Sequence, residues 1–130
     1  MATQDGYCTE VQVKLHMSDK EMARLTDDDD GTTIDSDVVT EGIVTVSRLM
    51  WGVIRPRYSA TTAMSPEDYT AGTYMQLEHI AAALTAEWLR AYRPVGRGQQ
   101  RTIIEGYDPI MEHSGMKYLQ YVRQGRADIY

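Results

Sequence analysis

The fold is decided by residues 36–55, which read SDVVTEGIVTVSRLMWGVIR. Apolar residues recur there at intervals of three and four, as one buried face of a helix requires. They are Val39, Ile43, Val46, Met50 and the pair Val53 and Ile54. Gly42 and Ser47 are small enough to let another helix approach closely, and Asp35 or Ser36 can cap the first turn. The segment is therefore predicted to be a long helix with one buried side.

Two further long helices are expected downstream, over about 73–92 and 105–124, where apolar residues again follow helical spacing. Pro56 should end or kink the first helix, because proline lacks an N–H and its ring clashes with the preceding turn. The segment Pro94–Gly98 stops the second helix, and Gly125 stands where the cap of the third belongs.

Two short helices are expected near the N-terminus. Thr9–Gln12 and Ser18–Glu21 both have the spacing of a capping box, in which two side chains cap each other's backbone. The joint between the two helices falls at Met17 and Ser18. Residues 11–15 alternate strictly between apolar and polar, so a short strand remains an alternative for the first helix.

The connection over 59–72 is rich in Ser, Thr, Ala, Pro and Gly, and within it Ser65–Asp68 resembles a helix start. A chain of 130 residues is expected to form a single domain, here over 1–130. The expected class is all-α. It is a small bundle of two or three long helices, preceded by two short N-terminal helices and followed by an extended C-terminal tail over 125–130.

Acidic residues are concentrated in the first third of the chain. Lys and Arg number 13 and Asp and Glu number 19, which gives a net charge of −6. Residues 1–40 hold ten acids and three bases (−7), whereas residues 41–130 hold nine acids and ten bases (+1). A protein whose main task is to grip DNA or RNA phosphates needs a basic face, so the charge argues against that class.

The composition excludes several other classes. The single cysteine, Cys8, rules out an internal disulfide and a cysteine-based zinc site within one chain. No apolar run approaches the roughly 18 residues of a membrane span, and the N-terminus lacks the features of a signal peptide. The chain has no Phe but nine Tyr, which favour half-exposed positions and interfaces because the hydroxyl needs a partner. We therefore expect a soluble intracellular protein with no membrane partner.

The acidic loop over 26–35 reads TDDDDGTTID. We align it with an EF-hand calcium loop by setting Gly31 at the sixth position. Asp28 and Asp30 then fall on ligand positions and Asp37 on the last one, but a threonine stands at the first. Two of the ligands are therefore wrong or weak. The loop is interpreted either as a solvated acidic segment or as a loose cation site formed by Asp28, Asp30 and Asp37.

No motif typical of an enzyme is present in the sequence. His16, His79 and His113 stand far apart, and no HExxH motif occurs. Gly96–Gly98 lacks the preceding strand and the following Lys of a phosphate-binding loop, and no Ser or Cys nucleophile motif is found. Acid–base catalysis by two carboxylates that the fold brings together from distant positions stays an open alternative. We expect a protein without catalytic residues and without a cofactor.

Arginines gather around the expected helix ends in the last third of the chain. They are Arg90, Arg93, Arg97, Arg101, Arg123 and Arg126. Positive charge at the C-terminal end of a helix complements its dipole. These residues therefore either stabilise helix ends or form a surface for an acidic partner.

Four segments of the chain follow one another in the same order as similar segments in a known protein family. They are Ala23–Gly31 (ARLTDDDDG), Ile34–Asp35, Arg57–Tyr58 and Val122–Ile129 (VRQGRADI). Together they resemble the small head–tail connector proteins (adaptor or head-completion proteins) of tailed bacteriophages, especially the phage Mu-like connector group. The resemblance spans nearly the whole chain. It departs from the family at Pro56, which interrupts the usual passage into Arg-Tyr, and in the 59–72 connection, which holds fewer prolines.

The resemblance implies a structural virion protein. Such proteins form a ring, commonly of twelve subunits, beneath the portal of a filled capsid. They extend the DNA channel and link the head to a downstream neck or tail-completion protein. The resemblance thus implies assembly in the host cytoplasm, a final place in the virion neck, and double-stranded DNA that passes through without specific binding.

The resemblance also implies two site segments. The acidic segment, formed by Asp27, Asp28, Asp29 and Asp30, would line the channel or a seam between subunits. The tail would dock on the portal protein. Its residues are Arg126, Ala127, Asp128, Ile129 and Tyr130.

Two other interpretations remain open at this point. One is a small helical regulatory module that binds a cation through Asp27–Asp30. The other is a tail-completion or tail-terminator protein at a neighbouring position in the neck, although such proteins are more often rich in β-strands.

Overall fold

The computed structural model describes residues 6–27, 31–92, 110–111 and 113–129, and within them every regular element is a helix. The elements are α1 (Glu10–Val13), α2 (Asp19–Thr26), α3 (Ser36–Tyr58), the 3₁₀ helix η1 (Thr62–Met64), α4 (Met75–Tyr92) and α5 (Ser114–Arg123). The predicted all-α class is confirmed, as is the helix rather than the strand at residues 11–13.

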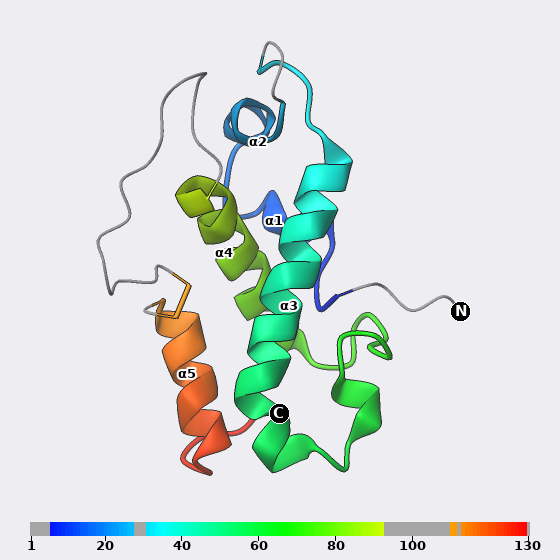
Figure 1. Ribbon diagram of the computed structural model, residues 1–130, viewed down its shortest axis with the longest axis vertical. Coiled ribbons are helices and arrows are strands. Elements are labelled where there is room, and N and C mark those ends of the chain that lie inside the picture. Colours follow the sequence, from blue (N-terminus) through cyan, green and yellow to red (C-terminus); the bar gives the residue numbers. More distant parts are fainter. Residues whose placement is uncertain (1–5, 28–30, 93–109, 112, 130) are drawn as a thin grey trace.

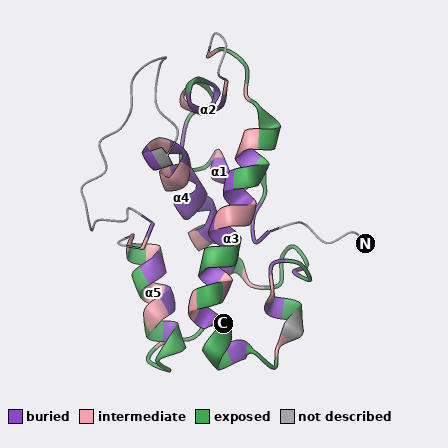
Figure 2. Ribbon diagram, viewed as in Figure 1, coloured by how far each residue is buried: buried purple, intermediate pink, exposed green. Residues whose placement is uncertain are grey.

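The long helix α3 forms the axis of the molecule (Figure 1). Helices α4 and α5 both pack against it, α5 beside its C-terminal half, and α1 packs chiefly on α4. Helix α2 lies across the end of the molecule where α3 begins (Figure 1). The buried sides of these helices face one another and form a single core (Figure 2).

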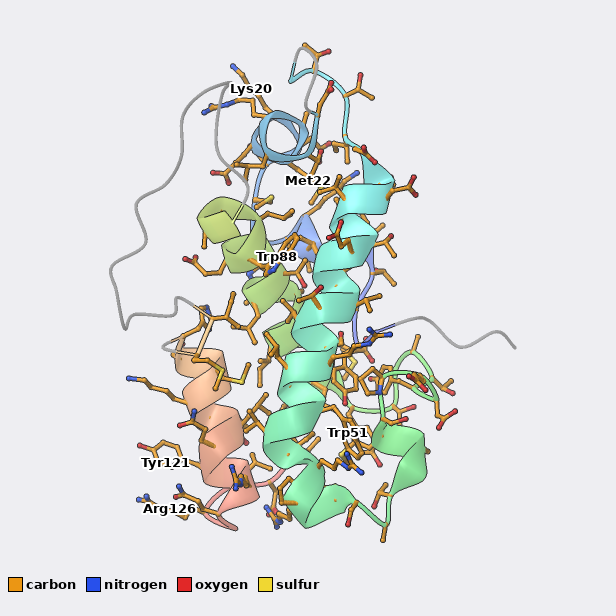
Figure 3. The ribbon with its side chains drawn as sticks, in the orientation of Figure 1. Lys20, Met22, Trp51, Trp88, Tyr121 and Arg126 are labelled. Carbon is orange, nitrogen blue, oxygen red and sulfur yellow. The ribbon has the colours of Figure 1, made fainter. Side chains whose placement is uncertain are left out.

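The N-terminal cap and the buried side of α3 agree with the sequence pattern. Asp35 caps the helix, because its Oδ1 accepts the backbone N–H groups of Asp37 at 3.0 Å and Val38 at 3.4 Å. Gly42 faces Trp88 of α4 so closely that an added Cβ would lie 2.8 Å from Trp88 Cε3. Figure 3 shows Trp88 between the two helices. The expected close approach of another helix at Gly42 is confirmed.

The sequence predicts that the first long helix ends before Pro56. In the structure, α3 continues to Tyr58. The proline lies on the exposed side of the helix, and so does Gly52. The carbonyl of Gly52, which loses its hydrogen-bond donor four residues on, can therefore bind water. Tyr58 is buried and Arg57 binds the C-terminal segment, so tertiary contacts hold the last turn in place.

Other boundaries also differ from expectation. Helix α4 begins at Met75 rather than near residue 73, and residues 66–68 form a turn where a helix start was expected. Helix α5 begins at Ser114, whereas the pattern predicted a helix from 105. Residues 105–109 and the predicted stop at Pro94–Gly98 lie outside the described residues.

The predicted cap at Gly125 is confirmed. Gly125 has a φ of +77°, a left-handed conformation that glycine adopts without strain. Its N–H donates to the carbonyl of Val122 at 3.0 Å, and the N–H of Arg126 donates to the carbonyl of Tyr121 at 2.9 Å. These two bonds form a Schellman motif, which turns the chain back toward the body of the molecule.

Methionine and tyrosine fill the core in the absence of phenylalanine. Met22, Met50 and Met64 are fully buried. Tyr7 and Tyr69 are also fully buried, with their rings edge to face at 5.2 Å, so these two do not occupy the half-exposed positions expected of tyrosines. None of the helices in the described part of the chain combines the length and the apolar character that a membrane span needs.

Candidate functional site

The acidic loop is fastened at both ends by its own side chains. Thr26 Oγ1 donates to the carbonyl of Met22 at 2.8 Å and accepts the N–H of Asp35 at 2.9 Å. Asp27 Oδ2 accepts the N–H of Thr33 at 3.1 Å. The residues that flank the loop therefore join the end of α2 to the start of α3.

The structure places only part of the predicted cation site. Asp28, Asp29 and Asp30 lie outside the described residues. Asp37 is exposed in the first turn of α3. Among the residues that are described, no group of three or more His, Cys, Asp or Glu side chains is placed to hold a metal ion. The cation site from Asp28, Asp30 and Asp37 stays a prediction.

The C-terminal tail is folded back onto the body. Arg57 Nη1 donates to the carbonyls of Val122 at 2.7 Å and Ala127 at 2.6 Å, while its Nη2 forms an ion pair with Asp128 Oδ1 at 2.8 Å. Ile129 is 1% exposed and belongs to the core. The tail is non-helical, as predicted, but it does not project from the molecule.

Two side chains of the neighbouring helices hold the tail as well. The hydroxyl of Tyr118 donates to the carbonyl of Asp128 at 2.6 Å. The amide nitrogen of Gln76, in the orientation that satisfies its surroundings, donates to the carbonyls of Asp128 and Ile129, each at 3.0 Å. Ile129 therefore anchors the tail and is not available for docking in this arrangement.

The outward side of the tail carries a different pair of residues. The guanidinium of Arg126 lies 4.8 Å from the centre of the Tyr121 ring, and both residues are exposed at the C-terminal end of α5 (Figure 3). Of the five predicted docking residues, Arg126 and Asp128 are exposed and Ala127 is half-buried. Tyr130 lies outside the described residues.

Glu78 is the centre of a buried polar cluster that the sequence did not reveal. It is 3% exposed. Its Oε1 accepts the side-chain amide of Gln12 at 2.8 Å, and its Oε2 accepts the Tyr69 hydroxyl and the N–H of Gly72 at 2.7 Å. The cluster thus joins α1, the 65–74 segment and α4.

The charge state of this cluster follows from its contacts. Burial by itself raises the pKa of Glu78, but the hydrogen bonds from Tyr69, Gln12 and Gly72 outweigh burial and leave the pKa below its usual value. Burial, followed by the hydrogen bond to Glu78, raises the pKa of Tyr69. Glu78 is therefore an ionised acceptor at neutral pH, and its pKa is too low for a general base of the usual kind.

Cys8 lies near this cluster and is 3% exposed. Burial raises the pKa of its thiol to about 12, although a hydrogen bond with Thr85 acts in the opposite direction. The reactive form of cysteine is the thiolate, which is scarce at neutral pH when the pKa is this high.

The three histidines are closer in space than their spacing in the sequence suggested. Burial lowers the pKa of His16, and the positive charges of His79, Arg90 and His113 lower it further. Arg90 Nη2 also donates to the carbonyl of His16 at 2.8 Å. His113 caps α5, because its Nδ1 accepts the N–H of Gly115 at 3.0 Å. These electrostatic effects do not make a ligand set, because no group of three His, Cys, Asp or Glu side chains in the described part of the chain is placed to hold a metal ion.

An open hollow lies between the N-terminal parts of α4 and α5. Its volume is about 460 Å³, and it is lined by Met75, Gln76, His79, Ile80, Ser114, Gly115 and Tyr118. Met75 at its edge is 56% exposed, and on α1 the exposed fractions of Val11 and Leu15 are 72% and 77%. These three residues, which we call the exposed apolar set, are large side chains that the fold of one chain leaves in water.

The sequence matches no known protein-family model and no curated protein. Any statement of function therefore rests on the chain's own residues, their geometry and the resemblance described above.

Proposed function

We propose that the chain is a structural subunit of the head–tail junction of a tailed bacteriophage. It forms a ring, of twelve copies by the resemblance, beneath the portal and links the head to the next neck or tail component. The proposal is supported by the observation that each of the four resembling segments contains a residue whose hydrogen bonds join two parts of the fold. Arg57 joins the end of α3 to the tail, and the flanks of the acidic loop join α2 to α3.

The surface of the single chain supports an assembly role. The exposed apolar set, Val11, Leu15 and Met75, would be covered by neighbouring subunits in a ring. A ring requires two different patches on each subunit that fit each other. The hollow between α4 and α5 offers a concave apolar patch, and the α1 residues offer a convex one.

The acidic segment Asp27–Asp30 suits a channel wall or a seam beside it. The start of the loop lies at one end of the molecule, beyond α2 and next to the first turn of α3 (Figure 1). A negatively charged wall releases no counterions when DNA passes, so DNA is not retained. Double-stranded DNA is therefore a neighbour of this protein and not a specific ligand.

Only some of residues 126–130 are available for docking on the portal. Ile129 is engaged in the core, so the side chains available for contact are the exposed Arg126 and Asp128 together with Tyr121 of α5. A deletion of the tail would remove the buried anchor Ile129 together with the exposed residues Arg126 and Asp128. Arg126→Glu is the cleaner variant, because it reverses a surface charge and leaves Ile129 in place.

The test is electron microscopy of the purified chain mixed with rings of the portal protein from the same phage. We expect added ring density on one face of the portal, weakened by Arg126→Glu and weakened further at lower salt, where charge repulsion is less screened. The matched control is Arg24→Glu on α2, which should leave attachment unchanged. A chain that leaves the portal rings bare at every ratio tested would refute the proposal.

A further inference from the structure

The outward face of α3 carries charges that are sorted by sign along its length. Asp37 and Glu41 lie in its first two turns, and Arg48 and Arg55 lie in its second half. All four residues are exposed. Their spacings of four, seven and seven residues keep them on one side of a helix with 3.6 residues per turn, over about 27 Å. We call these four residues the α3 charge stripe.

The fold of a single chain does not account for this stripe. Among the described residues, every ion pair is formed by side chains other than these four. The helix dipole favours acids in the first turn and bases in the last, which explains Asp37 and Arg55. Glu41 and Arg48 lie in the interior of α3, where that effect has faded.

Gly52 lies within the stripe and has no packing reason to be glycine. A Cβ added there would meet nothing within 4 Å, in contrast to Gly42, where it would meet Trp88 of α4. Glycine inside a helix is unfavourable relative to alanine, so a position that needs no glycine for its own fold suggests a close approach from outside. Leu49 beside it is 41% exposed.

We propose that α3 of one copy pairs antiparallel with α3 of a second copy along this stripe. The midpoints of the pairs Asp37 with Arg55 and Glu41 with Arg48 both fall near residue 45. A two-fold axis near Thr45 therefore sets both acids of each copy opposite both arginines of the other. The same patch serves both copies, which is the definition of an isologous contact.

The charges also decide the direction of the pair. A parallel arrangement would set acids against acids and arginines against arginines, which is repulsive. A single helix pair buries less than the roughly 800 Å² per partner of a standard stable interface. The pair is therefore weak, it forms at high protein concentration and low salt, and it dissociates as salt screens the charges. The inference does not depend on the proposed function.

The test is sedimentation velocity of the full chain over a concentration series at low salt. We expect a monomer–dimer equilibrium for the natural chain and a loss of dimer of at least tenfold in Arg48→Glu/Arg55→Glu and in Asp37→Arg/Glu41→Arg. An equimolar mixture of the two variants should restore a dimer, because one stripe is then fully negative and the other fully positive. The matched control is Lys20→Glu/Arg24→Glu, which makes the same charge change on α2 and should dimerise as the natural chain does.

Two further variants test the geometry. Gly52→Leu should weaken the dimer at least tenfold, whereas Lys20→Leu, exposed on α2, should not. Under oxidation Thr45→Cys should form a disulfide-linked dimer and Ser59→Cys should not, because an antiparallel pair separates the two copies of residue 59. A natural chain that stays monomeric, a mixture without a dimer, or equal cross-linking at both positions would overturn the proposal. Circular dichroism of each variant confirms that the helices are intact.

Discussion

Arg57 Nη1, in the last turn of α3, donates to the carbonyl of Ala127 at 2.6 Å across 70 residues of sequence. The same nitrogen binds the carbonyl of Val122 at 2.7 Å. These carbonyls lie at the end of α5 and just beyond it. One side chain therefore donates hydrogen bonds to a carbonyl at the helix end and to one in the tail, and so fixes the direction of the tail. The arrangement explains why α3 continues past Pro56, because the last turn carries the residue that holds the C-terminus.

Replacing Arg57 should destabilise the fold more than replacing any other exposed arginine. Arg57→Ala removes the donors for two carbonyls and one carboxylate, and a loss of about 2 kcal/mol in the free energy of unfolding is expected. Arg57→Lys should recover only part of this, since an ammonium lacks the planar fork of donors. Urea unfolding measures the difference. Arg55→Ala is the control, and an equal loss in both variants would show that the contacts of Arg57 contribute nothing.

Ile129 makes the tail part of the core. Ile129→Ala should lower the free energy of unfolding by about 2–4 kcal/mol, as expected for a buried aliphatic side chain. Arg126→Ala should change it by less than about 0.5 kcal/mol, because Arg126 is exposed. Thermal unfolding of both variants checks this pair. Similar melting temperatures would mean that the tail is detached from the body in solution.

The sequence predicted the long helices well because their signal is local. Val39, Ile43 and Val46 follow the period of a helix, and Gly125 marks a helix end by its own conformational freedom. The predicted helix end before Pro56 is wrong because the contacts that keep its turn helical come from residues 122–128. Such distant contacts leave no trace in a local pattern.

The same limit applies to the candidate site. Glu78 stands in a helical stripe of mixed residues, and only the fold brings Gln12, Tyr69 and Gly72 around it. The effect of His79 and His113 on the pKa of His16 likewise depends on the fold, because spacing along the chain says little about distance between elements. In contrast, the flanks of the acidic loop were recognisable, since Asp35 caps the helix that directly follows it.

Two glycines of α3 should respond in opposite ways to the same substitution. Gly42→Ala places a Cβ 2.8 Å from Trp88 Cε3 and should destabilise the fold by about 1–3 kcal/mol. Gly52→Ala meets no neighbour within 4 Å and should stabilise it by up to about 1 kcal/mol. Both effects are read from chemical denaturation at low protein concentration, where the chain is monomeric. Destabilisation by Gly52→Ala would mean that this part of α3 is not a regular exposed helix.

Calcium should have little effect on the fold. Asp27 and Asp35 already accept backbone N–H groups with their carboxylates, so these two acids are engaged in capping and turn contacts. We expect no shift in the melting temperature and no heat in titration calorimetry at millimolar calcium. The variant with Asn at Asp28, Asp29 and Asp30 is the control. Heat that appears in the natural chain and vanishes in this variant would restore the regulatory interpretation.

Glu78 should make the stability of the fold depend on acid pH. Its pKa is lowered in the folded protein, so the unfolded chain takes up a proton first as the pH falls. The stabilisation is therefore complete above the ordinary pKa of Glu, about 4.3, and is lost as the pH falls through the lower folded value. In Glu78→Gln the amide cannot accept all the donors, and a loss of about 3 kcal/mol at neutral pH is expected. Urea unfolding from pH 7 to pH 3 should show a steeper fall for the natural chain than for this variant. Glu87→Gln on the same helix is the control, and parallel curves for all three proteins would show that Glu78 is not the group that titrates.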